Sequence, residues 1–266
     1  MIIDLNGTLQ DADSARIDPT DRGFTLGDGV FETIRVRGGK PDRIAAHLAR
    51  LREGAGTLGI TVPTPDVGIV KRLAGVLAAN DLSDAVVRLT LSQGPAPRGL
   101  LPPDPGFPTL MISAAPLPPP GGPVKAIIAL TTRRNEYSPL SRIKSLSYLD
   151  SVIARREAET YGAEDALLMN SQGRLAESTI SNLFLMINGA VLTPPVSEGA
   201  LPGVMRADIL KRFRGEEQPL TPEDLSRAEE AFLTNALGIR PLVAVAGQPI
   251  GDGQPGLITQ LLAARL

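Results

Sequence analysis

Residues 115–123 read Ala-Pro-Leu-Pro-Pro-Pro-Gly-Gly-Pro. Proline has no backbone N–H group and a fixed φ angle, so a stretch this rich in proline can neither continue a helix nor donate into a β-ladder. Such a segment behaves as a stiff, extended connector. We therefore predict an N-terminal α+β domain over 1–115, an interdomain connector over 116–123 and a second domain over 124–266.

The first half combines tight turns with two periodic segments. Asn6-Gly7 and Gly38-Gly39 are dipeptides that supply the positive φ angles of a two-residue hairpin turn. Apolar residues recur every three or four positions in two longer segments, and two short apolar runs come after them. These patterns predict helices over 42–58 and 65–80 and buried strands over 86–92 and 109–115.

The second half repeats this mixture. Asn188-Gly189 predicts another tight turn, and Gly162 is a natural stop for a helix that begins near Ser145. A further helix is expected after Pro202-Gly203. Apolar runs predict strands over 124–131, 165–169, 183–187, 190–192 and 231–234. Because strands and helices interleave while hairpins dominate, we expect α+β architecture in both halves.

The composition excludes several kinds of chemistry. The 266 residues include no cysteine and one histidine, His47, which rules out disulfides, thiolate zinc sites and cysteine nucleophiles and argues against a histidine metal site. A net charge of −2 and few aromatic residues argue against nucleic-acid binding, and no apolar run is long enough to span a membrane. We expect a cytoplasmic protein whose chemistry depends on Lys, Arg, Glu, Tyr, Thr and a cofactor, without a metal.

Lys144 is the first candidate for that chemistry. It lies in the segment Arg-Ile-Lys-Ser-Leu-Ser-Tyr-Leu at 142–149, at a predicted strand-to-helix transition with apolar neighbours on both sides. A partly desolvated lysine has the lowered pKa that imine formation requires. A solvated lysine at the start of a helix fits the local sequence at least as well.

Two further segments bear on this choice. The segment 176–182 places one carboxylate, Glu177, beside small hydroxyl and amide side chains, although a polar turn has the same composition. The segment 201–206 runs from a glycine turn into a predicted helix start, where free N–H groups hold phosphate. Most helix starts bind nothing, so neither segment identifies a site by itself.

Taken together and in this order, the segments resemble a known family. With Asp-Arg-Gly-Phe-Thr-Leu-Gly-Asp-Gly-Val-Phe-Glu-Thr-Ile-Arg at 21–35, His-Leu-Ala-Arg-Leu at 47–51 and Thr-Asn-Ala-Leu at 234–237, they resemble the class IV aminotransferases, which are pyridoxal-phosphate enzymes of fold type IV. The family includes branched-chain aminotransferases, D-amino-acid transaminases and 4-amino-4-deoxychorismate lyases. The resemblance implies a smaller N-terminal α/β sandwich and a larger, β-barrel-like C-terminal domain with flanking helices that binds pyridoxal 5′-phosphate.

The resemblance also implies roles for individual residues. Lys144 would hold the cofactor as a Schiff base and move the substrate proton, while Glu177 would pair with the pyridine nitrogen. The 5′-phosphate would be held by Arg50, by backbone N–H groups of Val204 and Met205, and by the turn at Asn235 and Ala236. Tyr148 and Thr33 would lie beside the reacting atoms, with Thr33 and Arg98 contacting the substrate. Met205 replaces the threonine of many relatives, so we expect Arg50 to contribute more to phosphate binding.

The substrate-choosing motifs point in two directions. Thr33, the stretch 92–99 and the turn 235–237 resemble the lyases, whereas Tyr148 and the cluster 178–182 resemble the transaminases. We favour transfer of an amino group between an amino acid and a 2-oxo acid. The alternative is an aminodeoxychorismate lyase that releases pyruvate and 4-aminobenzoate, and a third possibility is a homologue that binds the cofactor without catalysis. The resemblance further implies a homodimer, with the loop Gln93–Leu101 reaching the partner's site.

Overall fold

The computed structural model describes residues 1–265, which divide into two compact units. Unit 1 comprises Met1–Pro119 and Ile143–Ser147; unit 2 comprises Pro120–Arg142 and the chain from Tyr148 onward. The first division falls inside the proline-rich connector. The second departs from the predicted boundaries, because a short segment of the expected C-terminal domain belongs to unit 1.

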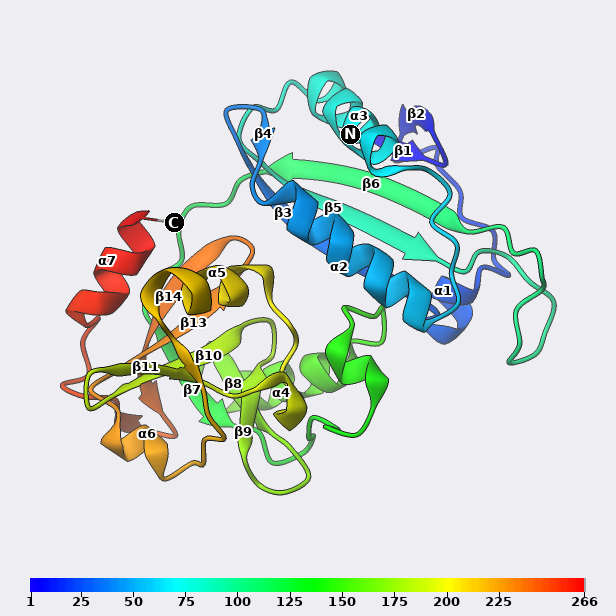
Figure 1. The fold of residues 1–266 in the computed structure, drawn as a ribbon. Helices are drawn as coiled ribbons and strands as arrows, with labels where there is room; N and C mark the ends of the chain where they lie inside the picture. The colour runs from blue at the N-terminus through cyan, green and yellow to red at the C-terminus, as the bar shows by residue number, and fades with distance from the viewer. Residues whose placement is uncertain (266) are drawn as a thin grey trace. The chain divides into compact units, whose positions relative to one another are not determined.

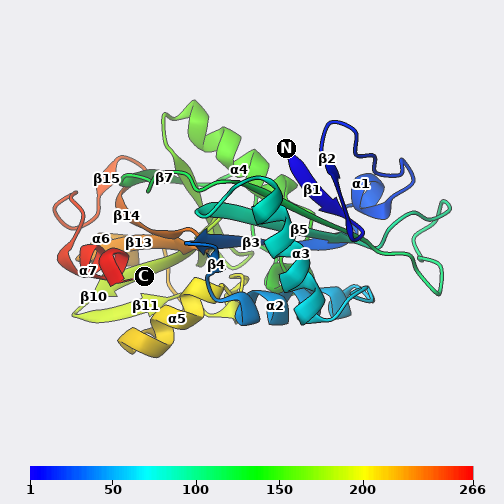
Figure 2. The same cartoon turned by 90° about the horizontal axis from the view of Figure 1, so that it is seen from above.

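Unit 1 is a six-stranded sheet with two helices on one face. The strand order is β2-β1-β6-β5-β3-β4, and the packing of α2 and α3 on the sheet can be followed in Figures 1 and 2. The core between them contains Leu48, Leu51, Ile69 and Leu73 from the helices. The elements are β1 (Ile2–Leu5), β2 (Thr8–Asp11), α1 (Arg22–Leu26), β3 (Gly29–Arg37), β4 (Lys40–Pro41), α2 (Ile44–Thr57), α3 (Asp66–Ala79), β5 (Ala85–Ser92) and β6 (Thr109–Pro116).

The predicted turns and helices of this half are confirmed. Asn6 and Gly7 have φ angles of 53° and 92°, and Gly38 and Gly39 have 53° and 73°, as two-residue hairpin turns require. Helix α2 begins two residues later than predicted because Arg43 has a φ of 50°, which is incompatible with a helix.

The segment Ile143–Ser147 pairs with β3. Ser145 forms an antiparallel bridge to Val30, the N–H of Phe31 donates to the Lys144 carbonyl (2.9 Å), and the N–H of Leu146 donates to the Gly29 carbonyl (2.9 Å). These bonds hold the segment extended, so the helix predicted from Ser145 begins only at Leu149. The prediction was wrong at this point because backbone pairing with a distant strand overrides the local helical pattern.

Unit 2 is built on a curled, nine-stranded sheet in the order β12-β11-β10-β13-β14-β7-β8-β9, with β15 paired to β14. Strand β9 leads directly into β10 through a short turn in which the Ser178 N–H donates to the Ser181 carbonyl (2.8 Å). The strands are β7 (Val124–Ile128), β8 (Asp165–Met169), β9 (Leu175–Ser178), β10 (Asn182–Ile187), β11 (Ala190–Thr193), β12 (Glu216–Glu217), β13 (Glu230–Asn235), β14 (Gly238–Val245) and β15 (Gln248–Pro249).

Hydrophobic clusters lie on both faces of this sheet. One fills its inside, from Val124 to Ile250; on the other face Phe184 stacks on Phe232 with ring centroids 5.0 Å apart. The α-helices are α4 (Leu149–Thr160), α5 (Val204–Phe213), α6 (Asp224–Arg227) and α7 (Leu257–Arg265), and α4, α5 and α7 are drawn outside the strands in Figure 1. The predicted α+β class is confirmed, although β9 and β14 were not predicted. Within residues 1–265 no helix combines the length and the apolar character that a bilayer crossing requires.

Candidate active site

The predicted site residues divide between the units. Lys144, Arg50, Thr33 and Arg98 belong to unit 1. Those of unit 2 are Glu177, Tyr148, Val204, Met205, Asn235 and Ala236.

Lys144 is held by the backbone of β3 rather than by a helix start. Its carbonyl accepts from Phe31, and its Nζ lies 4.4 Å from the centroid of the Phe31 ring. The Cζ of Arg88, on β5, lies 3.8 Å from the same centroid. Both distances are in the range of cation–π contacts, so one aromatic ring orients two cationic side chains.

Phe31 and Thr33 point to one face of the sheet, and the residues paired with them on β5 point to the same face. Phe31 is paired with Thr90 and Thr33 with Arg88, and side chains of directly paired residues point to the same side. The other side of these strands carries Ile34 and Leu89, which pack in the core under the helices. The face therefore presents an amine, a guanidinium and two threonine hydroxyls, and within the described chain the buried Thr90 hydroxyl has no hydrogen-bond partner.

Arg50 lies on helix α2 and is engaged with a buried carboxylate. Its Nε and Nη2 donate to Oε1 and Oε2 of Glu32, both at 2.7 Å, and His47 Nδ1 lies 2.7 Å from Oε2. Because an ionised carboxylate only accepts, Nδ1 carries the proton. Burial raises the pKa of the Glu32 carboxyl, but Arg50 and His47 outweigh burial and hold that pKa below its usual value. Two N–H donors of the Arg50 guanidinium are thus already bonded to Glu32 when Arg50 meets a phosphate.

Arg98 is not brought to the Lys144 face within unit 1. It is exposed, in the loop between β5 and β6, and forms no hydrogen bond or ion pair in the part of the chain that the structure covers. The loop itself is anchored, because buried Arg22 donates to the carbonyls of Gly99 (2.8 Å) and Leu100 (2.7 Å) and pairs with Asp28 (2.7 Å).

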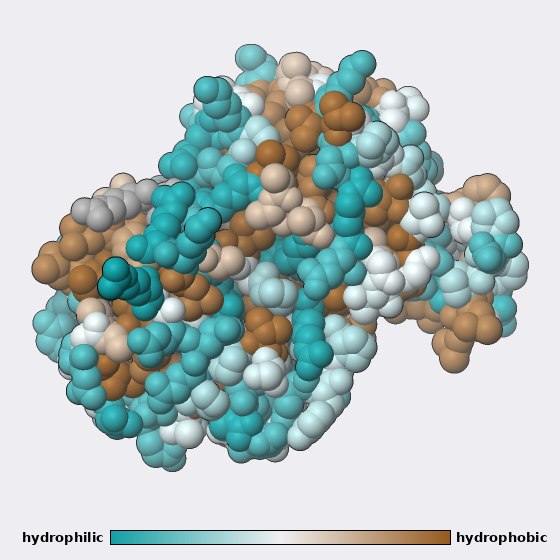
Figure 3. All heavy atoms as spheres, in the orientation of Figure 1, coloured by the Kyte–Doolittle hydropathy of each residue, from teal (hydrophilic) through white to brown (hydrophobic). Residues whose placement is uncertain are grey.

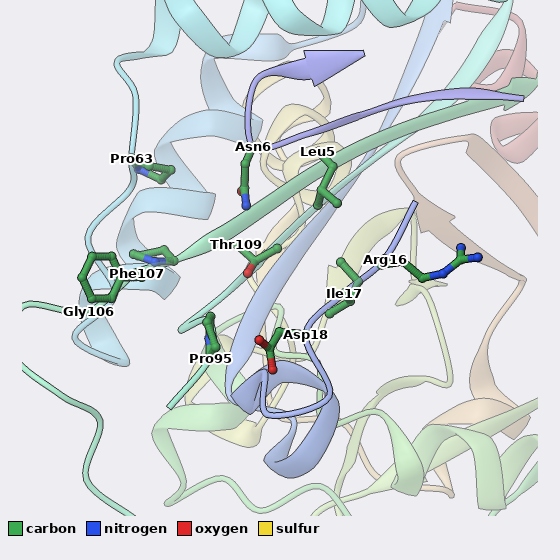
Figure 4. A pocket seen from close by; sticks show the side chains of 11 residues that line it. Leu5, Asn6, Arg16, Ile17, Asp18, Pro63, Pro95, Gly106, Phe107 and Thr109 are labelled. Atoms are coloured by element: carbon green, nitrogen blue, oxygen red, sulfur yellow. The ribbon is translucent and has the colours of Figure 1, made fainter. Parts of the chain in front are cut away.

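Unit 1 also has a pocket of about 520 Å³ away from Lys144. Its wall combines the β1–β2 turn at Leu5 and Asn6 with Pro95 and Phe107 of the β5–β6 loop, as Figure 4 shows. It contains none of the predicted site residues, so it is not the candidate active site.

Glu177 lies on strand β9 and not in a polar turn. Its side chain is buried, Oε1 lies 3.1 Å from Nε of Arg134, and Oε2 accepts from the Leu201 N–H (3.0 Å) and from Nδ2 of Asn182 (3.3 Å). Arg134 is fixed in turn by the carbonyls of Gly199 (3.0 Å) and Ser141 (2.8 Å). The carboxylate is therefore both oriented and charge-compensated by the protein.

Asn182 joins Glu177 to the predicted phosphate turn. Its Nδ2 also donates to the Leu201 carbonyl (2.8 Å), and its Oδ1 lies so close to Gly203 that a Cβ there would be 2.0 Å away. A side chain at 203 would therefore displace the Asn182 amide from its contacts with Glu177 and Leu201. Helix α5 starts at Val204 without a side-chain cap, which leaves its first N–H groups to face the turn.

The side chain of Met205 points into the protein. It is 2% exposed and packs with Phe184 and Phe232. Its side chain is therefore unavailable to an anion, and phosphate binding by its backbone N–H, in the first turn of α5, stays a prediction.

The turn at Asn235 and Ala236 neighbours the same region. Thr234, just before it, is paired with Asn182, and the Asn235 amide donates to the Ser181 hydroxyl (3.1 Å). The Leu237 N–H donates back to Asn235 Oδ1 (2.9 Å), which shapes the turn. The buried hydroxyl of Thr234 has no hydrogen-bond partner among the described residues. Unit 2 therefore gathers a fixed carboxylate, a helix start and an unsatisfied hydroxyl around Asn182.

A comparison with known protein families shows to which family this chain belongs. The model described as "Amino-transferase class IV" matches residues 29–245. The chain belongs to the class IV aminotransferase family. The prediction of a class IV aminotransferase with the corresponding fold is thus confirmed.

Relatives of this class IV aminotransferase include both chemistries of the family. A Methanocaldococcus jannaschii protein provisionally named as a branched-chain-amino-acid aminotransferase is 36% identical, over 98% of this chain and 94% of its own. The aminodeoxychorismate lyase of Bacillus subtilis is 31% identical, over 89% of this chain and 83% of its own. The branched-chain amino acid aminotransferase of T.th., solved with pyridoxamine 5′-phosphate, has the same fold (TM-score 0.91, 23% identity, covering 99% of this chain and 92% of its own).

Several residues of this class IV aminotransferase were not singled out from the sequence. Arg88 is the one charged residue in the apolar run 86–92, and that position was the available signal. Arg134 gave none, because its importance comes from its contact with Glu177, and Asn182 was noted only as a member of the polar segment 176–182. Tyr148 falls inside the helix predicted from Ser145, but in the structure it is the N-cap residue of α4.

Proposed function

We propose that this class IV aminotransferase binds pyridoxal 5′-phosphate and transfers an amino group between an amino acid and a 2-oxo acid. The observation that supports it best is a pair of groups that the protein holds in place. These are the Lys144 amine, which lies over the Phe31 ring, and the buried Glu177 carboxylate, which accepts two hydrogen bonds and pairs with Arg134. A nucleophilic amine and a fixed anion are the two groups that this cofactor demands of a protein.

The remaining features fit the cofactor's phosphate. The uncapped start of α5 and the unsatisfied Thr234 hydroxyl suit an anion in unit 2, and Arg50 supplies a cation in unit 1. When bound, pyridoxal phosphate supplies an aldehyde that condenses with amines and a ring that accepts electrons from the substrate. Lys144 would hold the aldehyde carbon and carry the proton to and from the substrate α-carbon. Glu177 would keep a proton on the pyridine nitrogen.

Arg88 suggests the class of substrate. A guanidinium beside the Lys144 amine, with two threonines on the same face, suits an anionic group such as the carboxylate of an amino acid or a 2-oxo acid. We propose transamination over elimination because both amino donor and 2-oxo acceptor carry such a group, and because the more similar of the two relatives is named as a transaminase.

A substrate panel tests this function. We expect the purified, cofactor-loaded protein to form a new amino acid from L-leucine, L-glutamate or D-alanine only when a 2-oxo acid acceptor is present. Release of pyruvate from aminodeoxychorismate without consumption of an acceptor would instead assign the lyase reaction. If neither class of substrate is turned over, the protein is a homologue that binds the cofactor without catalysis. Chromatography of the amino acids and a coupled pyruvate assay measure the outcomes.

We further propose that the protein is a homodimer in which the loop Gln93–Leu101 reaches the partner's site. Exposed apolar side chains support this, and they gather on α1 and on the β5–β6 loop: Phe24 (79% exposed), Leu26 (50%), Leu100 (83%), Leu101 (89%) and Phe107 (70%). Figure 3 shows hydrophobic atoms on the projecting loop at the right of the view. Apolar groups exposed this fully are typical of an interaction surface.

Charge on this loop should break the dimer. We expect the double variant Leu100→Asp, Leu101→Asp to sediment as a monomer and to lose activity, because both charges would be buried in the interface. Val67→Asp is the matched control, since Val67 is 75% exposed on α3 and should leave the dimer intact. A wild-type protein that sediments as a fully active monomer would refute the proposal.

A further inference from the structure

Glu32 is a completely buried carboxylate whose partners come from one helix. It lies on β3 with 0% of its surface exposed, and both oxygens are engaged by Arg50 while His47 lies against Oε2. Arg50 and His47 are one turn apart on α2, so the strand carboxylate is bound to two adjacent side chains of the helix.

The contact determines how Arg50 can meet another anion. A guanidinium is planar and has five N–H donors, of which Glu32 takes one on Nε and one on Nη2. Two parallel bonds fix the guanidinium plane and its rotation. A second anion must therefore be met by the two terminal nitrogens, on the edge that Glu32 does not occupy.

We propose that Glu32 is a positioning residue for the cofactor phosphate, which holds the terminal nitrogens of Arg50 in the orientation that the phosphate requires. The inference rests on the proposed function, in which Arg50 binds that phosphate. It adds that Arg50 serves two anions at once. A lysine at position 50 has its three donors on a single nitrogen, so it cannot form the two parallel bonds to Glu32 that fix the orientation of the group.

A purely structural pair in the same unit provides the comparison. Asp4 on β1 is 2% exposed, and its Oδ1 accepts from Nε of Arg72 on α3 (2.9 Å). This is again a buried strand carboxylate paired with a helix arginine, but neither residue is a predicted site residue. Loss of either carboxylate should destabilise unit 1, because an arginine loses its buried partner. Only the loss of Glu32 should affect the phosphate.

The test compares pyridoxal phosphate with pyridoxal, which lacks the phosphate, in titrations of the apo-protein followed by absorbance. We expect Glu32→Gln to weaken pyridoxal phosphate binding by about tenfold to a hundredfold, the effect of disturbing a charge-assisted contact, and to change pyridoxal binding by less than about twofold. Asp4→Asn should leave both affinities at the wild-type value while lowering the thermal midpoint as Glu32→Gln does.

The outcomes separate this inference from the proposed function. Wild-type protein that does not bind pyridoxal phosphate, or Arg50→Lys protein that binds it as tightly as wild type, would overturn the proposed role of Arg50. If Arg50→Lys weakens binding while Glu32→Gln does not, or if Glu32→Gln weakens both ligands equally, the positioning role of Glu32 is wrong. Should Glu32→Gln not fold, Glu32→Asp keeps the charge but shortens the side chain, and the same phosphate-specific loss is expected.

Discussion

Replacing Lys144 with alanine should abolish covalent attachment of the cofactor and lower the rate of amino-group transfer at least about a thousandfold, because both the imine-forming amine and the proton carrier are lost. The structure gives this amine a fixed place, with Nζ 4.4 Å from the Phe31 centroid and its backbone bonded to β3. Borohydride treatment followed by mass spectrometry measures the attachment. The wild-type peptide that contains Lys144 should gain the mass of one reduced cofactor.

Lys71→Ala is the matched control, since Lys71 is an exposed lysine on α3 of the same unit. It should retain both attachment and turnover. Attachment that persists in Lys144→Ala would show that another lysine holds the cofactor.

Replacing Glu177 with glutamine should leave the cofactor bound but slow removal of the substrate α-proton by about two to four orders of magnitude, since a neutral amide cannot hold the proton on the pyridine nitrogen. The same change leaves Arg134, 3.1 Å from the carboxylate, without its counter-charge. An uncompensated positive charge near the ring opposes protonation further. Loss of deuterium from the α-carbon of a labelled amino acid, followed by NMR, measures this step directly.

Glu230→Gln controls for removal of a carboxylate from the same sheet. Glu230 is on β13, where its oxygens accept from the N–H groups of Ile258 (3.1 Å) and Thr259 (3.0 Å) at the start of α7. Exchange in this variant should match wild type. If the Glu177→Gln variant exchanges the α-deuterium at nearly the wild-type rate, Glu177 has no role in this step.

Local sequence patterns were sufficient to predict turns and helices wherever a residue's conformation depends mainly on its neighbours in sequence. The turns at Asn6-Gly7 and Gly38-Gly39 and the helix over 65–80 follow from backbone preferences and a 3.6-residue period, and the structure has them within one or two residues. Identification of Lys144 and Glu177 depended instead on the order of several segments along the chain. Either residue alone was compatible with an ordinary surface position.

Long-range pairing accounts for what the sequence could not supply. Ser145 is paired with Val30, more than a hundred positions earlier in the chain, so no local signal marked its segment as extended. Arg134, Asn182 and Glu32 are polar residues whose partners lie on other elements. A polar turn was the alternative interpretation of the segment around Glu177, because its neighbours are small and polar, yet pairing with β8 makes the segment a strand.

The pairing of Ile143–Ser147 with β3 also affects how the protein is made. During synthesis the first 119 residues emerge as a sheet whose β3 lacks one bonded neighbour, along Gly29–Phe31, until Ser147 has left the ribosome. By then β7, at Val124–Ile128, has already emerged without its partners β8 and β14. Unit 1 can therefore be completed only after the first strand of unit 2 has been synthesised. A fragment cut at the proline-rich connector would carry an open strand edge that favours aggregation.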